Sequence, residues 1–539
     1  MRALLTTLCL VLALPVLGVL GAWFAADAAA WAVLEHQVHT VLPDYALQSL
    51  LLAVGVAVGV MAVGAGAAAA VTLFEFPGRR VFEWALLLPL AMPAYVLAYA
   101  WTDALQYSSP LQSGLRQMLG VRGALWPDVR SLWGAVLLFV LCLYPYVYLL
   151  ARTALGERAV QLLEAARLLG AGPRRRILGV ALPLARPAIA AGVALAMMET
   201  LADYGVSAYF GLATFSTGIL KAWMVMNDGT AAAQLASVLL AVVALLLTVE
   251  RAAQKRLRFA ASRGGASHTA DARPLPLHGA AGGLAFLLCA LPVLLGFVLP
   301  VAWLAWMLWQ EAYNAELGLP LVRFVQWAWS TLRLASLAAV LAAALALAVA
   351  FAMRRGGRGP LQAAARLLAL GYAVPGAVIA VGILLPAGWL QHRWPEAPVA
   401  AIVTGTLFGL MYAYLARFSS VALQSIESGY ARVPLSVDET ARMLGADASR
   451  VFARLHLPLL RRSALAAALL VFVDVMKELP ATLVLRPFGS DTLAVVAFNF
   501  ARDERLGEAA LPSLAIVAVG LLPVMLLSRA LRSGGTARG

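Results

Sequence analysis

Charged residues are scarce in this chain. Asp, Glu, Lys and Arg together make up 13% of its 539 residues, compared with about 25% in soluble domains. Hydrophobic residues make up 62%, which is more than a soluble fold buries. The composition therefore excludes a soluble protein and predicts an all-α polytopic membrane protein.

Lysine is nearly absent: Lys221, Lys255 and Lys477 are the only three, and none of them follows a glycine. The phosphate-binding pattern GxxxxGK[ST] is therefore missing. This predicts a chain with no ATP site and no catalytic residues, so any energy from ATP must come from a separate subunit.

Cysteine and histidine are also rare. The three cysteines lie far apart inside apolar runs, which excludes a disulfide framework and a cysteine-based metal site. The six histidines contain no HExxH pair. His36 and His39 stand at i and i+3 and could bind a metal, but we interpret them as a solvated pair.

The net charge of +14 sets the membrane topology. Of the 41 Lys and Arg residues, 30 fall at Arg2 and in six alternate loops. This alternation follows the positive-inside rule and predicts that both termini are cytoplasmic, so we expect no nucleic-acid partner. The six loops are 79–80, 152–186, 251–273, 354–366, 417–462 and 529–538.

Twelve apolar stretches are long enough to cross a bilayer, which takes about 20 residues. A basic stretch from 251 to 278 separates six of them from the other six. The first could be a cleavable signal, but its sequence ALPVL at 13–17 recurs at 290–294, so we take it as retained. The twelve are 4–26, 46–73, 83–104, 132–152, 187–210, 232–250, 282–308, 330–353, 361–388, 399–422, 464–485 and 510–530.

One sequence pattern occurs twice in the same register. The second copy starts at Glu439, 275 positions after the first copy at Glu164. In both copies a glycine stands six residues after the glutamate and a proline nineteen residues after it. An even number of spans separates the copies, so we expect parallel repeats with both copies in the cytoplasm. The residues are Glu164, Ala165, Ala166, Gly170 and Pro183 in the first copy, and Glu439, Ala441, Gly445 and Pro458 in the second.

Each copy predicts a short helix that docks on a partner. Good helix formers precede Gly170 and Gly445, and glycine is the preferred residue just past a helix C-terminus. The proline is expected to stop this helix before the next span. Apolar side chains of such a helix can enter a groove of the partner, while its glutamate pairs with a cation. A single copy fits an amphipathic connector equally well, whereas the paired register favours docking.

Charged residues lie inside the span that follows each copy. They come about ten residues, or roughly 15 Å of helix, beyond the point of re-entry. Charge at that depth normally faces a pathway or a partner, and Gly205 and Pro480 just beyond it predict broken helices. We therefore predict a substrate pathway at Glu199, Asp203 and Tyr204 in the first half, and at Asp474, Lys477 and Glu478 in the second.

These charges could also serve the structure. Asp474 and Lys477 stand at i and i+3 and can neutralise each other, so a structural ion pair is an equal alternative. Glu199, Asp203 and Glu478 have no evident local cation in the sequence. Four carboxylates against one lysine leave an acidic balance that suits a hard cation such as Fe³⁺. The ligands of any metal site stay unidentified.

The repeated pattern resembles the EAA loop of ABC importer permeases, with Thr440 where alanine is usual. The layout of the chain, ETLADYG at 199–205 and DVMKELPATL at 474–483 look like the fused permeases of ferric-iron ABC importers. The resemblance implies twelve transmembrane helices in two tandem six-helix type-I permease repeats. It also implies a multi-pass protein of the bacterial inner membrane, two copies of a cytoplasmic ABC ATPase that bind ATP and Mg²⁺, a periplasmic substrate-binding protein, and no cofactor in this chain.

Importers of thiamine, polyamine or aminoethylphosphonate share this architecture and stay open as alternatives. An ion-driven secondary transporter is a further alternative, but it has no ATPase to engage and no use for docking loops. The expected domains are a first helix with a periplasmic loop at 1–44, a first permease domain at 45–251, a cytoplasmic linker at 252–280, a seventh helix with a periplasmic loop at 281–326, a second permease domain at 327–532 and a tail at 533–539.

Overall fold

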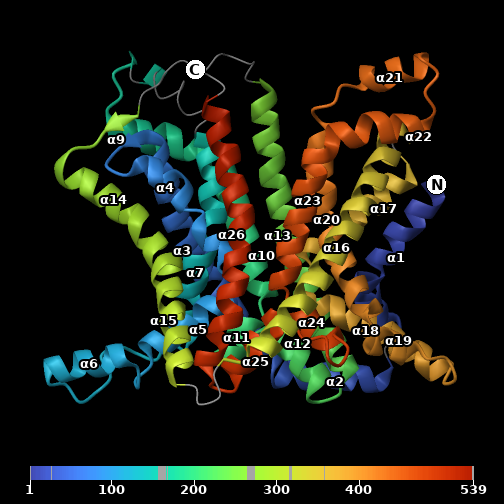
Figure 1. Cartoon of the computed structure of the whole chain (residues 1–539), viewed down its shortest axis with the longest axis horizontal. Coiled ribbons are helices and arrows are strands. Elements are labelled where there is room, and N and C mark those ends of the chain that lie inside the picture. The colour runs from blue at the N-terminus through green and yellow to red at the C-terminus, as the bar shows by residue number, and fades with distance from the viewer. Residues whose placement is uncertain are drawn as a thin grey trace. The chain divides into compact units, whose positions relative to one another are not determined.

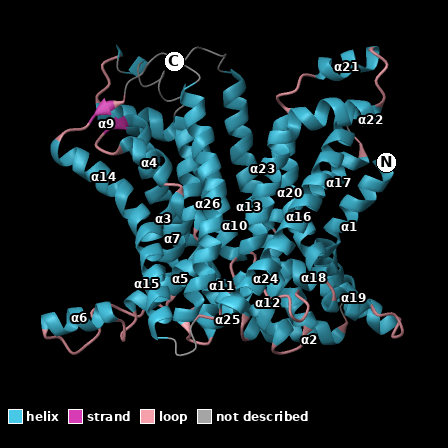
Figure 2. Ribbon diagram, viewed as in Figure 1, coloured by secondary structure: helices cyan, strands magenta, loops and turns pink. Residues whose placement is uncertain are grey.

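The computed structural model describes residues 2–25, 27–155, 165–166, 168–263, 274–314, 319–356 and 359–536. Nearly all of them are helical (Figure 1, Figure 2), and two short strands, β1 (Phe74–Glu75) and β2 (Leu275–Pro276), pair in parallel. The predicted all-α class is confirmed. A helix satisfies its backbone N–H and C=O groups internally, which a segment in hydrocarbon requires.

Two compact units make up the chain, and neither follows one half of the sequence. Unit 1 comprises Met1–Thr40, Gly218–Leu240 and Pro320–Val496. Unit 2 comprises Val41–Thr217, Ala241–Leu319 and Ala497–Gly539. The first helix of the chain therefore groups with helices of the second half, and the seventh apolar stretch groups with the first half. The domain bounds expected from the repeat stay a prediction.

Unit 1 begins with α1 (Arg2–Gly21), which packs against α17 (Pro360–Leu368) and α18 (Gly376–Arg393) (Figure 1). A Cβ atom on Gly18 would lie 2.6 Å from the carbonyl oxygen of Gly382, so the backbones of α1 and α18 are nearly in contact. Such small residues let helices associate in a membrane. The other elements of this unit are η1 (Ala22–Ala25), α2 (Ala28–His39), α16 (Leu321–Gly356), η6 (Gly371–Ala373), α19 (Val399–Gly405), α20 (Leu407–Tyr430), α21 (Leu435–Met443), α22 (Ala448–Arg450), η7 (Val451–His456), α23 (Leu457–Lys477) and α24 (Pro480–Leu485).

In unit 2, α7 (Leu132–Ala154) packs against both α3 (Leu42–Leu73) and α10 (Leu182–Ala202). A Cβ atom on Gly64 of α3 would lie 2.7 Å from the carbonyl oxygen of Tyr144, and one on Gly192 of α10 would lie 2.7 Å from the Cα of Val147. The other elements are α4 (Arg79–Ala85), η2 (Leu88–Ala91), α5 (Ala94–Leu105), α6 (Pro110–Leu119), α9 (Pro173–Arg176), η4 (Ile177–Ala181), α11 (Gly205–Tyr209), α14 (Gly279–Val293), η5 (Leu294–Val298), α15 (Leu299–Asn314) and α26 (Leu506–Thr536). Three helices contribute residues to both units: α12 (Phe215–Met224), α13 (Gly229–Arg263) and α25 (Leu493–Arg502).

Within the described residues, eight helices are long and apolar enough to cross a membrane, or eleven if each bent helix pair counts as one span. The expected count of twelve is not confirmed. The spans expected at 83–104, 361–388 and 399–422 are bent pairs, with angles of 92°, 120° and 68°. The span expected at 464–485 falls on α23 and α24, and α23 is less apolar because it carries two arginines, an aspartate and a lysine.

Proline accounts for two of these bends. Met92 and Val374 each precede a proline, and their ψ angles of 113° and 124° are extended rather than helical. The ring of the following proline sterically disfavours the α conformation at such a residue, so the helix ends there. Pro93 and Pro375 then occupy the N-cap positions of α5 and α18.

Both ends of the expected linker are regular structure. The helix α13 continues to Arg263, while β2 is held by β1 through the pairs Phe74–Leu275 and Glu75–Pro276. The amide of Leu277 also donates to the carbonyl oxygen of Glu75 at 2.9 Å. Residues 264–273, between these ends, lie outside the described part of the chain.

Candidate functional site

In both copies of the repeated pattern, the helix ends in the same backbone turn. Gly170 and Gly445 have φ angles of +82° and +77°, the left-handed region that glycine tolerates best. In the first copy the amide of Ala171 donates to the carbonyl oxygen of Ala166 at 2.9 Å, and in the second the amide of Ala446 donates to Ala441 at 3.0 Å. This is the Schellman pattern that terminates a helix, as the sequence predicts.

The second copy is best seen in α21 (Leu435–Met443), where Glu439 is exposed to solvent. Large apolar side chains are exposed beside it: Leu435 is 62% accessible, Met443 89% and Leu444 82%. Leu168 and Leu169 of the first copy are equally exposed, at 89% and 88%. Ala165 and Ala166 are helical, whereas Glu164 lies outside the described residues. Exposed leucines on a short helix fit a docking element.

The prediction that proline stops the helix is wrong. Pro183 and Pro458 lie in the first turn of α10 and α23, and each of these helices continues directly from a π-helical turn, η4 or η7. Proline is tolerated at the start of an α-helix because its missing N–H is not needed there. The wider π turn just before the proline accommodates the irregular backbone hydrogen bonding there. The helix that starts after each glycine turn, at Pro173 or Ala448, therefore runs into the next span without a break.

Both spans break beyond their charged residues, as predicted. The helix α10 ends at Ala202 and α23 ends at Lys477. Gly205 and Pro480 are the first residues of the short helices α11 and α24 that follow, so they start new helices instead of ending old ones.

The carboxylates at these breaks cap the short helices. Asp203 accepts hydrogen bonds from the amides of Val206 at 2.9 Å and Ser207 at 3.3 Å, at the start of α11. Glu478 accepts from the amide of Ala481 at 3.0 Å, and from the amide and hydroxyl of Thr482 at 2.9 Å and 2.5 Å. A carboxylate at a helix N-terminus satisfies amides that have no intrahelical partner.

No cation is evident as a local partner of Glu478 in the sequence, but the fold brings one to it. Its Oε1 lies 3.2 Å from Nη1 of Arg417 on α20, and the two side chains are 1% and 13% accessible. Arg417 starts the basic loop expected at 417–462, although it also lies inside the apolar stretch 399–422. A lone arginine within an expected span was the signal for this pair, because a buried charge in a membrane needs a counter-charge.

The remaining predicted pathway residues are half-buried. Glu199 lies on α10, and Asp474 and Lys477 lie on α23. Tyr204 follows the break after α10, and its ring packs at 5.6 Å from the ring of Phe498. In the described parts of the chain, no three His, Cys, Asp or Glu side chains gather as metal ligands.

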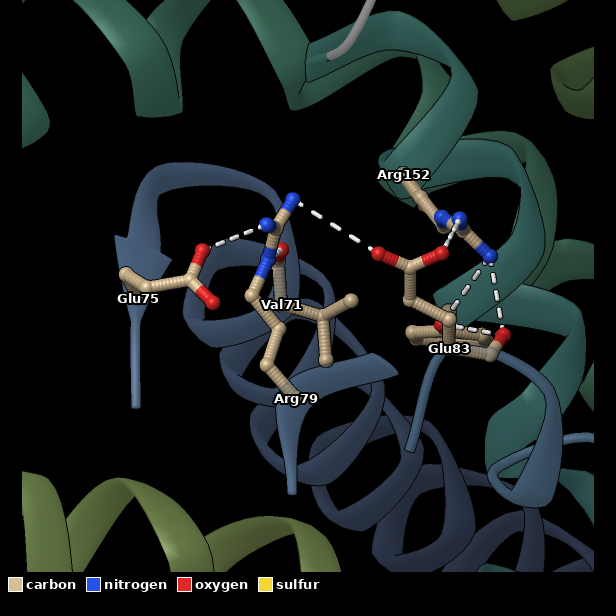
Figure 3. Close-up of polar contacts among 6 residues, drawn as sticks. Val71, Glu75, Arg79, Glu83 and Arg152 are labelled. Atoms are coloured by element: carbon tan, nitrogen blue, oxygen red, sulfur yellow. Dashed lines mark hydrogen bonds and ion pairs between the residues drawn. The ribbon is translucent and has the colours of Figure 1, made fainter. Parts of the chain in front are cut away.

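A polar cluster in unit 2 includes Arg152, which stands shortly before the first copy in the sequence (Figure 3). Arg152, near the end of α7, donates to the backbone carbonyl oxygen of Glu83 at 2.8 Å and to its carboxylate at 3.2 Å. Arg79 lies 2.7 Å from the carboxylate of Glu75 and 3.6 Å from that of Glu83. No sequence pattern predicts this cluster, which joins α4 to the end of α7.

Residues 62–259 match the family of binding-protein-dependent transport system inner membrane components. The matched part of the chain contains the first copy of the repeated pattern and the break between α10 and α11. The chain is also similar to the Fe(3+)-transport system permease protein FbpB 2 of Haemophilus influenzae, with 24% identity over 484 residues that cover 89% of this chain and 88% of that protein.

Two other permeases match shorter parts of the chain. The putative 2-aminoethylphosphonate transport system permease protein PhnV of Salmonella typhimurium is 28% identical over 244 residues, which are 43% of this chain and 88% of that protein. The molybdenum transport system permease protein ModB of Escherichia coli is 33% identical over 138 residues, which are 25% of this chain and 57% of that protein. These similar proteins are all subunits of transport systems, and the many apolar helices fit a multi-pass inner-membrane protein.

Proposed function

We propose that this chain is the permease subunit of an ABC importer in the bacterial inner membrane and that it translocates ferric iron. The choice of ferric iron rests on the similarity to a Fe(3+)-transport permease over 89% of this chain, since PhnV and ModB match shorter parts. The two glycine-terminated segments at Gly170 and Gly445 support the coupling to ATP. We call them the first and second coupling segments.

In this proposal, two copies of a cytoplasmic ATPase bind ATP and Mg²⁺ and dock on the two coupling segments. The chain itself holds no cofactor and performs no covalent chemistry. The exposed Leu435, Glu439 and Met443 support docking, because apolar side chains beside a carboxylate suit a groove with a cation. A periplasmic binding protein delivers the substrate on the opposite side, and both termini are cytoplasmic.

The substrate passes the helix breaks in this proposal. Closure of the ATPase dimer moves the coupling segments. The helices that start just after the two glycine turns carry the motion into α10 and α23, because they are not interrupted at the prolines. At the far ends of α10 and α23, Asp203 and Glu478 bind the N-termini of α11 and α24. A helix break that carries a carboxylate suits a pathway through which a cation moves.

A phosphonate such as 2-aminoethylphosphonate is the second candidate substrate. PhnV is matched over 88% of its length, and Arg417 adds a cation at the break after α23. Guanidinium groups bind phosphonate-like anions well.

The test is uptake of radiolabelled Fe³⁺ by cells that lack the chain and by cells in which it is restored, with the ATPase and binding protein present. Labelled 2-aminoethylphosphonate, thiamine and spermidine are the controls. We expect iron uptake that requires the chain and ATP. ATP-driven uptake of another ligand without iron uptake would refute the substrate and leave the permease assignment intact.

The docking assignment has its own test. Replacing Glu164 and Glu439 by Ala in one variant should leave the protein inserted but abolish ATP-driven uptake. Arg450→Gln is the matched control, since Arg450 lies in α22, beyond Gly445 and outside the second coupling segment, and its exposed guanidinium is 3.9 Å from the carboxylate of Asp447. Unchanged uptake in the double variant would overturn the docking assignment.

A further inference from the structure

The second coupling segment carries one buried charge. Asp438 stands directly before the exposed Glu439 on α21, yet its side chain is only 4% accessible. A helix of nine residues is marginal in water on its own and must be held by contacts with other elements. Asp438 makes these contacts with Arg354 and His456. We call these three residues the clamp.

Arg354 holds the carboxylate and the backbone around it. It lies near the C-terminal end of α16, and its Nε and Nη2 donate to Oδ2 of Asp438 at 2.8 Å and 2.6 Å. The same Nη2 donates to the carbonyl oxygens of Val433 and Pro434, both at 2.9 Å. One guanidinium therefore fixes both α21 and the turn that leads into it, a role that the planar fork of arginine suits.

His456 holds the other carboxylate oxygen. Its Nε2 lies 2.7 Å from Oδ1 of Asp438, and its side chain is fully buried. Its Nδ1 lies 3.1 Å from the hydroxyl of Tyr430 at the end of α20. Because His456 is the last residue before α23, the clamp connects α21 to three long helices: α16, α20 and α23.

The clamp sets which face of α21 turns outward. Leu435, Glu439 and Met443 stand at i, i+4 and i+8, so they form one stripe along the helix, and all three are exposed. Asp438 lies about 100° away around the helix and is drawn inward. Rotation of α21 about its axis would turn the stripe away from solvent, and the bonds to Asp438 oppose that rotation.

Two of the three equivalent positions in the first half of the chain carry uncharged residues, whereas Arg79 stands 275 positions before Arg354. Leu163 and Ala181 stand 275 positions before Asp438 and His456, in the register of the repeated pattern. A leucine and an alanine form no ion pair. The polar cluster of Arg79, Glu83 and Arg152 lies before the first segment and joins α4 to α7 (Figure 3).

We propose that Arg354, Asp438 and His456 are positioning residues that make the second coupling segment a rigid lever. The proposal rests on the proposed function, because a lever has meaning only if an ATPase docks there. Force applied at Glu439 passes through the clamp into α16, α20 and α23.

The first measurement is hydrogen–deuterium exchange of the full chain, which requires neither substrate nor ATPase. We expect the amides of 435–443 to be protected from exchange. Asp438→Asn, which keeps the shape of the side chain and removes its charge, should reduce the protection of 435–443 roughly tenfold or more. The first segment should not change, and Arg450→Gln serves as the matched control.

The second measurement is the ratio of substrate taken up to ATP hydrolysed, in vesicles that hold the complete transporter. Asp438→Asn and Arg354→Lys should lower this ratio several-fold while ATP hydrolysis continues, because the ATPase still binds but no longer moves a rigid lever. Asp438→Glu, which keeps the charge, should restore part of it. A purely structural role would lower uptake and hydrolysis together.

The outcomes separate the clamp from the proposed function. If Asp438→Asn leaves exchange of 435–443 and the coupling ratio unchanged while Glu439→Ala abolishes uptake, the clamp is refuted and the docking stands. If the wild-type chain takes up no substrate with ATP, the proposed function fails, and the exchange experiment still decides whether Asp438 holds α21. Rapid exchange of 435–443 in the wild type would overturn the clamp.

Discussion

Arg417 and Glu478 form a buried ion pair at the break between α23 and α24, with 3.2 Å between Nη1 and Oε1. The same carboxylate caps α24 through the amides of Ala481 and Thr482. Both oxygens of Glu478 are therefore engaged. A charge inside an apolar span persists here because it is paired and hydrogen-bonded at once.

Removal of Arg417 should destabilise the protein more than neutralisation of Glu478. Arg417→Leu leaves a buried carboxylate without its counter-charge, which costs about 3–5 kcal/mol. Glu478→Gln keeps an oxygen for the cap and removes the charge, so its cost should be smaller. Thermal unfolding of the purified protein in detergent measures both, and the double variant should regain part of the loss of Arg417→Leu. Equal melting temperatures for the two single variants would contradict the pairing.

Two substitutions of Asp203 can separate the effect of its charge from the effect of its capping hydrogen bonds. Asn is as good an N-cap residue as Asp, so Asp203→Asn should leave the melting temperature nearly unchanged. If Asp203 lines the pathway of a cation, this variant should nevertheless lower ATP-driven uptake, whereas ATPase binding stays intact. Asp203→Ala, which also removes the cap, should lose about 0.5–2 kcal/mol of stability in addition. Normal uptake by Asp203→Asn would remove Asp203 from the pathway.

Gly170 and Gly445 should be equally sensitive to alanine. Their φ angles of +82° and +77° cost an alanine roughly 1 kcal/mol, a factor of about five in the population of the correct turn. Uptake and ATPase binding should fall by a similar factor in Gly170→Ala and in Gly445→Ala. Gly172→Ala is the matched control, because its φ is not in this range and a Cβ there meets open space. A control variant as impaired as the other two would show that the turn is not the cause.

The stabilisation by Asp438 should be lost only in acid. Burial disfavours the charged form of Asp438, but the hydrogen bonds from Arg354 and the charges of Arg354 and His456 outweigh it and hold the pKa of Asp438 below its usual value. A carboxyl whose pKa is lowered by folding stabilises the fold above its unfolded pKa of about 3.9, and this contribution disappears as pH falls through the lower folded-state pKa.

The measurement is the difference in unfolding free energy between the wild type and Asp438→Asn as a function of pH. It should be constant between about pH 5 and pH 8 and should shrink below about pH 4. Burial lowers the pKa of His456, and the same comparison in a His456→Gln background removes its titration and isolates Asp438. A difference that disappears near neutral pH in that background would contradict the role of Asp438 as the titrating group.

Local interactions were predictable from the sequence. The turns at Gly170 and Gly445 depend on hydrogen bonds between residues five apart, and the helix breaks near Gly205 and Pro480 depend on neighbouring residues. The fold class followed from composition, because hydrocarbon admits few backbone structures. The wrong prediction at Pro183 arose from the same local reasoning, which did not include a π turn that lets a helix continue into a proline.

The sequence by itself determined that the chain is an all-α membrane protein with a duplicated sequence pattern and charged helix breaks. Only the tertiary structure decided which charges are paired. Arg417 and Glu478 are 61 residues apart, and Arg354 and Asp438 are 84 apart, so no local rule connects them. Their meeting depends on how α16, α20 and α23 pack, and it is this packing that turns Glu478 into a paired cap and Asp438 into the anchor of α21.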